Sequence, residues 1–121
     1  MSLGFVAYLY SRKQDQCYAD ADYGFFKSGS TISPHPDKAY KGGEDALAVK
    51  QRMISVADGV GGWSSHGVDV AKYSKQLMRI IWQVYDGNPD MRPYDILFEA
   101  DKLTTETGTS TAVIAVLDPY K

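Results

Sequence analysis

The stretch "SVADGVGGWSSHG", residues 55–67, lies between a short apolar run and the clearest helical pattern of the chain. The apolar run ends at Asp58, and three glycines fall within the next four positions. A tight turn would explain these glycines. Alternatively, Asp58 and the backbone carbonyl of Gly59 are presented to a metal ion, because a residue without a side chain lets its carbonyl approach an ion closely.

On either side of this stretch, hydrophobic periodicity predicts four strands and two helices. The strands are expected at residues 4–10, 46–50, 52–57 and 109–118, and the helices at residues 70–85 and from Pro93 to near Gly108. Residues 46–50 and 52–57 are joined with almost no spacer, which indicates an antiparallel hairpin. Residues 109–118 are apolar on both alternating faces, which is typical of a strand in the middle of a covered sheet. Residues 11–43 are rich in Gly, Ser, Pro and Asp and are expected to form a long loop.

Composition limits the class of protein. The chain has 121 residues, enough for one domain, with 44% apolar and 23% charged residues and a net charge of −2. This charge and the absence of a Lys/Arg run argue against nucleic-acid binding. No apolar run reaches the length of about 20 residues that spans a membrane. The lone Cys17 cannot form an internal disulfide and fits an intracellular, reducing compartment.

Three carboxylates are expected at one rim of the hairpin. Glu44 and Asp45 precede its first strand, and Asp58 ends its second, so antiparallel pairing brings them together. Each like-charge pair at about 4 Å and an effective dielectric near 20 costs roughly 4 kcal/mol. Either Lys41 or Lys38 compensates this charge in an ordinary salt-bridge network, or a hard cation such as Mg2+ or Mn2+ does, since every ligand on offer is oxygen.

Three motifs in this order, "GGEDALAV" (42–49), "SVADGVGGWSSHGVDVAKYSKQLM" (55–78) and "GTSTAVIAVLD" (108–118), resemble the metal-dependent Ser/Thr protein phosphatases of type 2C. The Asp-Gly-Val-Gly-Gly-Trp form is similar to the branch with mitochondrial and plastid members. The resemblance is strongest over residues 33–118. It implies an α+β fold, an antiparallel β-sandwich flanked by helices, of which residues 1–121 would be the N-terminal portion of a single catalytic domain.

The resemblance also implies a site and a reaction. Asp58 would bridge two Mg2+ or Mn2+ ions, Gly59 would offer its backbone carbonyl, and Glu44 would reach a metal through water, with Asp45 beside it. A metal-bridged water would then hydrolyse phosphoserine or phosphothreonine in a phosphorylated protein substrate.

The sequence departs from the family pattern at two positions. Val60 stands where many relatives carry a candidate acid, His, with His66 nearby; Tyr40 stands where many carry a phosphate-gripping Arg, for which Lys41 or Lys38 could substitute.

The family's other metal-binding aspartates come after the region where this chain stops. We therefore expect a fragment that is inactive by itself and whose sheet edge allows self-association. The alternative is a catalytically dead phosphatase-like module that acts through protein binding. Family resemblance suggests a mitochondrial or other organellar location, although no targeting segment is visible.

Overall fold

The computed structural model describes residues 2–10 and 25–118, so the prediction for Cys17 lies outside the described residues. The elements follow one another along the chain as β1 (Ser2–Tyr10), β2 (Phe25–Ser33), η1 (Pro36–Lys41), β3 (Ala46–Lys50), β4 (Met53–Gly59), η2 (Gly61–His66), α1 (Val70–Gly87), α2 (Pro93–Leu103) and β5 (Ser110–Val116). The segments η1 and η2 are short 3-10 helices.

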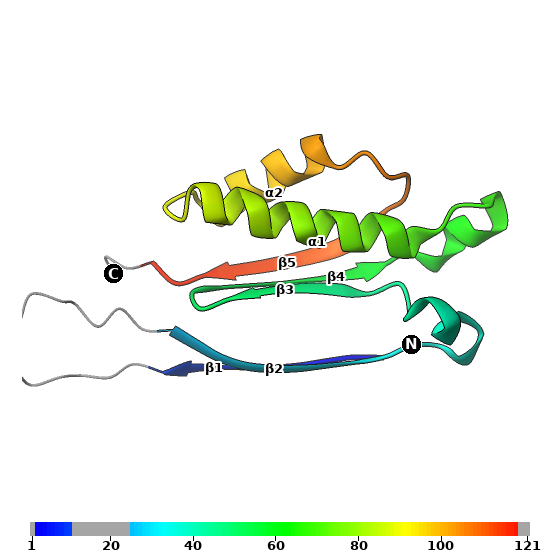
Figure 1. The fold of residues 1–121 in the computed structure, drawn as a ribbon, viewed down its shortest axis with the longest axis horizontal. Coiled ribbons are helices and arrows are strands. Elements are labelled where there is room, and N and C mark those ends of the chain that lie inside the picture. Colours follow the sequence, from blue (N-terminus) through cyan, green and yellow to red (C-terminus); the bar gives the residue numbers. More distant parts are fainter. Residues whose placement is uncertain (1, 11–24, 119–121) are drawn as a thin grey trace, which may run out of the picture.

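The strands form two antiparallel sheets, a β1–β2 hairpin and a three-stranded sheet of order β3–β4–β5. Helices α1 and α2 cover one face of the larger sheet, and the β1–β2 hairpin lies on its other side (Figure 1). The fold is therefore α+β, as the sequence predicts. None of the helices in the described part of the chain is long and apolar enough to cross a bilayer.

Strand β4 shows how the alternating pattern builds the core. Met53, Ser55 and Ala57 are buried on the face that packs against the helices. Asp58 falls on the opposite face, at the end of the strand, and is exposed. Period-two alternation thus places an acidic side chain on the face that looks away from the helices.

Helix α1 supplies the apolar stripe that meets this sheet. The stripe is buried at the positions that the periodicity selects: Val70, Ser74, Leu77, Met78, Ile81 and Tyr85. Asp69 caps the helix, because its side chain accepts a hydrogen bond from the backbone N–H of Ala71 at 3.1 Å. The predicted helix at residues 70–85 is confirmed, and it continues to Gly87.

One side chain of α1 holds the connection between α2 and β5. Oε1 of Gln76 accepts hydrogen bonds from the backbone N–H groups of Thr105 (2.9 Å) and Glu106 (2.8 Å). Its Nε2 donates to Oγ1 of Thr105 at 2.9 Å. The path of the chain into β5 is therefore set by α1.

Two predictions are wrong. The expected loop at residues 11–43 contains β2 and η1 within its described part. Strand β2 is largely polar and exposed, so its pattern carries no periodic signal, and nine residue pairs with β1 define it instead. Strand β5 lies at the edge of its sheet rather than in the middle, with β4 central and Val113 64% exposed.

Candidate metal centre

The β3–β4 hairpin brings Asp45 and Asp58 together. Ala46 pairs with Ala57, so the two aspartates stand next to each other just beyond that pair. Asp45 is 2% exposed and hydrogen-bonds the Asp58 side chain. Burial raises the pKa of Asp45, the neighbouring Asp58 carboxyl raises it further, and the backbone N–H of Gly59 opposes the shift. Each carboxyl group thus disfavours a negative charge on the other.

Glu44 lies next to this pair but has its own partner. Its side chain is fully buried, and Oε2 forms an ion pair with Nζ of Lys38 from η1. Its backbone carbonyl accepts a hydrogen bond from Oγ of Ser74 in α1 at 2.5 Å. The salt bridge that the sequence left open as one of two possibilities is therefore present for Lys38 and Glu44.

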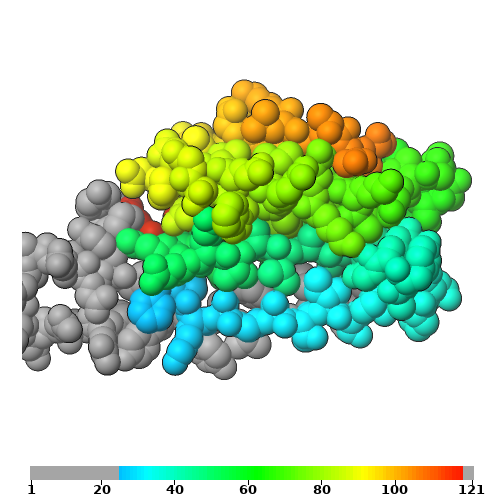
Figure 2. All heavy atoms as spheres, in the orientation of Figure 1, coloured from blue at the N-terminus to red at the C-terminus, as the bar shows by residue number. Residues whose placement is uncertain are grey.

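Two glycines at this end of the sheet lie against Glu44 and its ion pair. A Cβ on Gly59 would collide with the backbone carbonyl of Glu44 and would lie 2.7 Å from Cγ1 of Val70. A Cβ on Gly61 would lie 2.5 Å from Nζ of Lys38 and 3.0 Å from Oε2 of Glu44. Strand β4 and η2 therefore pack directly on Glu44 and its ion pair, and Figure 2 shows η1 (cyan) and η2 (green) at the same end of the molecule.

Lys41 occupies a different position on η1. Its Nζ lies 3.3 Å from Oδ1 of Asp69, and its backbone carbonyl accepts a hydrogen bond from Nζ of Lys75 at 2.8 Å. Both Lys41 and Lys38 thus have carboxylate partners, and a phosphate contact for either residue stays a prediction. Tyr40, between them in sequence, is 82% exposed.

The η2 segment forms a shallow hollow of about 260 Å³ beside the end of β4. It is lined by Val60, Gly62, Trp63 and His66. The indole N–H of Trp63 donates to Oγ1 of Thr109 at 2.8 Å, which joins η2 to the segment before β5. His66 is exposed and lies beside Ser65, whose Oγ is 3.1 Å from its Nδ1. Its role as an acid stays a prediction.

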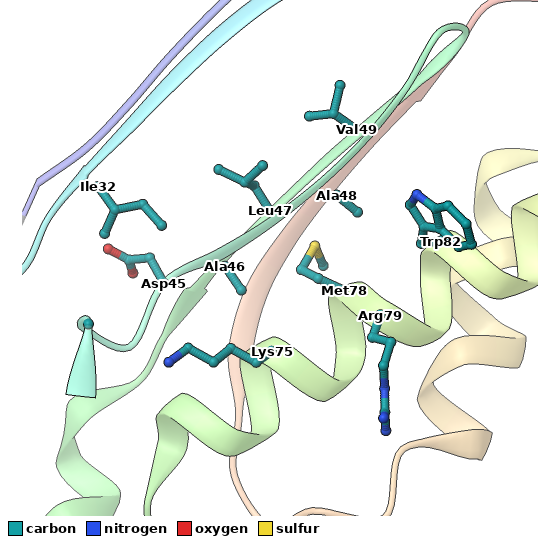
Figure 3. Close-up of a pocket in the computed structure, with 11 residues that line it drawn as sticks. Ile32, Asp45, Ala46, Leu47, Ala48, Val49, Lys75, Met78, Arg79 and Trp82 are labelled. Atoms are coloured by element: carbon teal, nitrogen blue, oxygen red, sulfur yellow. The ribbon is translucent and has the colours of Figure 1, made fainter.

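A longer groove of about 610 Å³ runs along the free side of β3 toward α1. Figure 3 shows Asp45 at one end of it, next to Ile32 of β2, and Trp82 at the other. Lys75 and Arg79 line it from α1. The sequence does not predict this groove, because its lining comes mainly from β3 and α1, which are distant in sequence.

The residues fit a hard divalent cation in kind, but the described part of the chain supplies only part of a ligand set. Oε1 of Glu44 and Oδ1 of Asp45 are buried oxygens without a hydrogen-bond partner among the described residues, and such oxygens suit Mg2+ or Mn2+. Among the same residues, however, no three His, Cys, Asp or Glu side chains converge to hold a metal ion. Two of the three expected carboxylates meet, and Lys38 neutralises the third.

Two of three comparisons with known proteins find relatives of this chain. No family model matches the chain. The Arabidopsis thaliana "Probable protein phosphatase 2C 55" is 40% identical over 94 residues, which cover 74% of this chain and 20% of that protein. "Probable protein phosphatase 2C 26" from the same organism is 42% identical over 91 residues, covering 70% of this chain and 30% of that protein.

A solved structure, the X-ray structure of the photosystem II phosphatase PBCP, superimposes with a TM-score of 0.66 at 30% identity. The match covers 97% of this chain and 39% of that one. The chain belongs to the protein phosphatase 2C family. It spans about a fifth to a third of the length of these curated relatives.

Proposed function

We propose that the protein carrying this sequence hydrolyses phosphoserine and phosphothreonine in phosphorylated proteins with the help of Mg2+ or Mn2+. The observation that supports this most is the buried Asp45 next to Asp58 at the end of the β3–β4 hairpin, beside the unpartnered Oε1 of Glu44. Family membership supports the phosphatase chemistry itself.

In this proposal, Asp58 is the central ligand because its carboxylate is exposed at the strand end while its backbone is fixed in β4. The carbonyl of Gly59 and the carboxylate of Asp45 lie next to it, and Glu44 acts through water. Bound divalent cations would acidify water and screen the charge that develops on the phosphoryl group. The burial of Glu44 and Asp45 fixes the positions of these two carboxylates beside Asp58.

We also propose that the 121 residues do not turn over substrate by themselves. Only two of the three expected carboxylates converge in the described residues, and two ions need more ligands than these. Calorimetric titration of the 121-residue chain with Mn2+ should therefore show weak binding or none. Tight binding of two ions would contradict this proposal.

The direct test of the proposed function is Mn2+-dependent hydrolysis of p-nitrophenyl phosphate by the full-length protein. We expect Asp58→Asn to lower the rate at least about a hundredfold, because it removes the charge that holds the ions. Asp101→Asn, an exposed position on α2, should leave the rate unchanged. Absence of hydrolysis by folded full-length protein with either ion would favour the alternative function, a phosphatase-like module that acts through protein binding.

For the location, we propose an intracellular, reducing compartment, and within it a mitochondrion or another organelle. The solved relative PBCP is a photosystem II phosphatase, which supports an organellar location for one member of the family. Imaging of the full-length protein fused at its C-terminus to a fluorescent protein tests this proposal, and a diffuse cytosolic signal would contradict it.

A further inference from the structure

The ammonium group of Lys38 lies inside the candidate metal centre. It forms an ion pair with Oε2 of Glu44, whose side chain is 0% exposed, whereas that of Lys38 is 25% exposed. On its other side the ammonium meets Gly61, where a Cβ would lie only 2.5 Å from Nζ. One positive charge of η1 thus lies between Glu44, which precedes β3, and Gly61 of η2.

A buried carboxylate without a compensating charge strongly destabilises a folded protein. Glu44 avoids this penalty through Lys38, which supplies the compensating charge from within the chain. A divalent cation that approaches Glu44 would meet the positive charge of Lys38 at close range, where repulsion is strong because water is largely excluded. The ammonium and the metal ion are therefore competitors for the same carboxylate.

We infer that Lys38 is a built-in counter-cation, which positions the Glu44 carboxylate in the metal-free protein and gives it up to a divalent ion when the metal centre is filled. This inference rests on the proposed function, because the exchange requires that ion. It assigns Lys38 a positioning role instead of the phosphate contact predicted from the sequence. The absence of a side chain at Gly61 leaves the space in which the ammonium sits.

Lys41 provides a matched control. It belongs to the same 3-10 helix, is similarly buried, with a side chain 20% exposed, and also forms an ion pair, at 3.3 Å with Asp69. Lys41→Met removes the same charge from the same helix, but Asp69 is partly exposed and is not one of the proposed metal ligands.

The experiment compares the full-length wild-type protein with Lys38→Met and Lys41→Met after removal of metal by a chelator. Thermal unfolding is followed by circular dichroism with and without MnCl2, and the Mn2+ affinity is measured by calorimetry. Lys38→Met should lower the metal-free midpoint by about 5 °C or more, because Glu44 loses its partner. It should also bind Mn2+ at least about tenfold more tightly, because the competing charge is gone.

Lys41→Met should change the Mn2+ affinity by less than about twofold, as expected for a more exposed pair. Mn2+ should raise the midpoint of Lys38→Met more than that of the wild type. If Lys38→Met does not fold without metal, Mn2+ should restore its far-ultraviolet spectrum; failure to fold at saturating Mn2+ would overturn the exchange.

The outcomes separate the two proposals. If the wild type and both variants fail to bind Mn2+ and Mg2+, the proposed function is wrong. The proposed replacement of Lys38 by a divalent ion at Glu44 is then wrong as well. If the wild type binds Mn2+ but Lys38→Met binds it with the same or lower affinity, the exchange alone is overturned.

Discussion

Packing requires a glycine at position 59. The sequence alone suggests a different reason, namely that the carbonyl of a residue without a side chain can approach a metal ion closely. The backbone of Gly59 does not adopt a left-handed conformation, since the glycines that do so in the described residues are Gly42, Gly43, Gly67 and Gly108. The constraint comes from the start of α1 and from the backbone of Glu44, which leave no room for a Cβ. These neighbours are distant in sequence, so periodicity cannot reveal them.

Gly59→Ala should therefore destabilise the protein by about 2–3 kcal/mol, because the methyl group meets Cγ1 of Val70 at 2.7 Å and a backbone oxygen that cannot move freely. Urea unfolding followed by circular dichroism measures the change. Gly62→Ala is the control, since a Cβ there meets no atom within 4 Å. Equal unfolding midpoints for the two variants would contradict this prediction.

Asp45→Asn should stabilise the metal-free protein at neutral pH by about 1 kcal/mol, because it removes a buried charge beside Asp58. The pKa of Asp45 is raised above its ordinary value of 3.8, so the folded state holds the proton more tightly than the unfolded chain. The stability that this proton provides is complete at a pH below the pKa of Asp45 in the unfolded chain. It is lost as the pH rises through the pKa of Asp45 in the folded protein. Asn cannot lose a proton and does not show that loss.

The advantage of Asp45→Asn should consequently disappear as the pH falls toward about 4. Chemical denaturation in chelator-containing buffers from neutral pH down to about pH 4 measures the stability difference between Asp45→Asn and the wild type. Asp37→Asn is the control, because Asp37 is a largely exposed carboxylate on η1. A constant difference across the pH range would show that the charge of Asp45 is not the cause. In the full-length protein, added Mn2+ should make the wild type more stable than Asp45→Asn, since the ion binds the wild-type carboxylate.

Among the elements, the success of sequence analysis follows the strength of the periodic signal. Helix α1 and the β3–β4 hairpin are amphipathic or regularly alternating, and their bounds agree with the prediction to within two residues. The same hairpin carries the correct prediction that Asp45 and Asp58 meet. Strand β2 escapes prediction because its identity lies in its pairing with β1. The position of β5 is predicted wrongly because an apolar strand can also lie at an edge whose outer face is uncovered.

Gln76 ties two elements together in a way that the sequence does not reveal, since a Gln in a helix is usually a solvated side chain. Gln76→Ala should lower the free energy of unfolding by about 1–2 kcal/mol, because two backbone N–H groups lose their acceptor. It should also speed the hydrogen exchange of the Thr105 and Glu106 amides. Gln83→Ala, an exposed position on the same helix, should leave both quantities near those of the wild type.

In the molecule as a whole, the two faces of the larger sheet are unequal. The helices cover one face, while on the other Val113 is 64% exposed beside a small apolar hollow of about 130 Å³. This hollow is formed by β4 and β5 and is lined by Ile54, Ser55, Val56, Val113 and Ala115. Although the β1–β2 hairpin lies on this side of the sheet, the apolar surface over β4 and β5 stays exposed next to a sheet edge, which favours association with another chain.

We therefore propose that the 121-residue chain self-associates through this face. Sedimentation velocity should show a concentration-dependent increase in mass, and Val113→Lys should shift the population toward monomer because the ammonium would be buried in the contact. Gln83→Lys adds the same charge on the exposed surface of α1 and should leave the distribution unchanged. A monomeric wild type at every concentration would contradict the proposal.

The two tryptophans of the chain lie toward opposite ends of the larger sheet, so tryptophan fluorescence can report on each end separately. Trp63 is anchored to Thr109 beside the end of β4, whereas the ring of Trp82 lies 3.3 Å from Nζ of Lys50, near the β3–β4 turn. In a 121-residue chain with Trp82→Phe, the remaining tryptophan emission comes from Trp63, next to the candidate metal centre. The response of that emission to added Mn2+ can then be followed in real time without an attached dye.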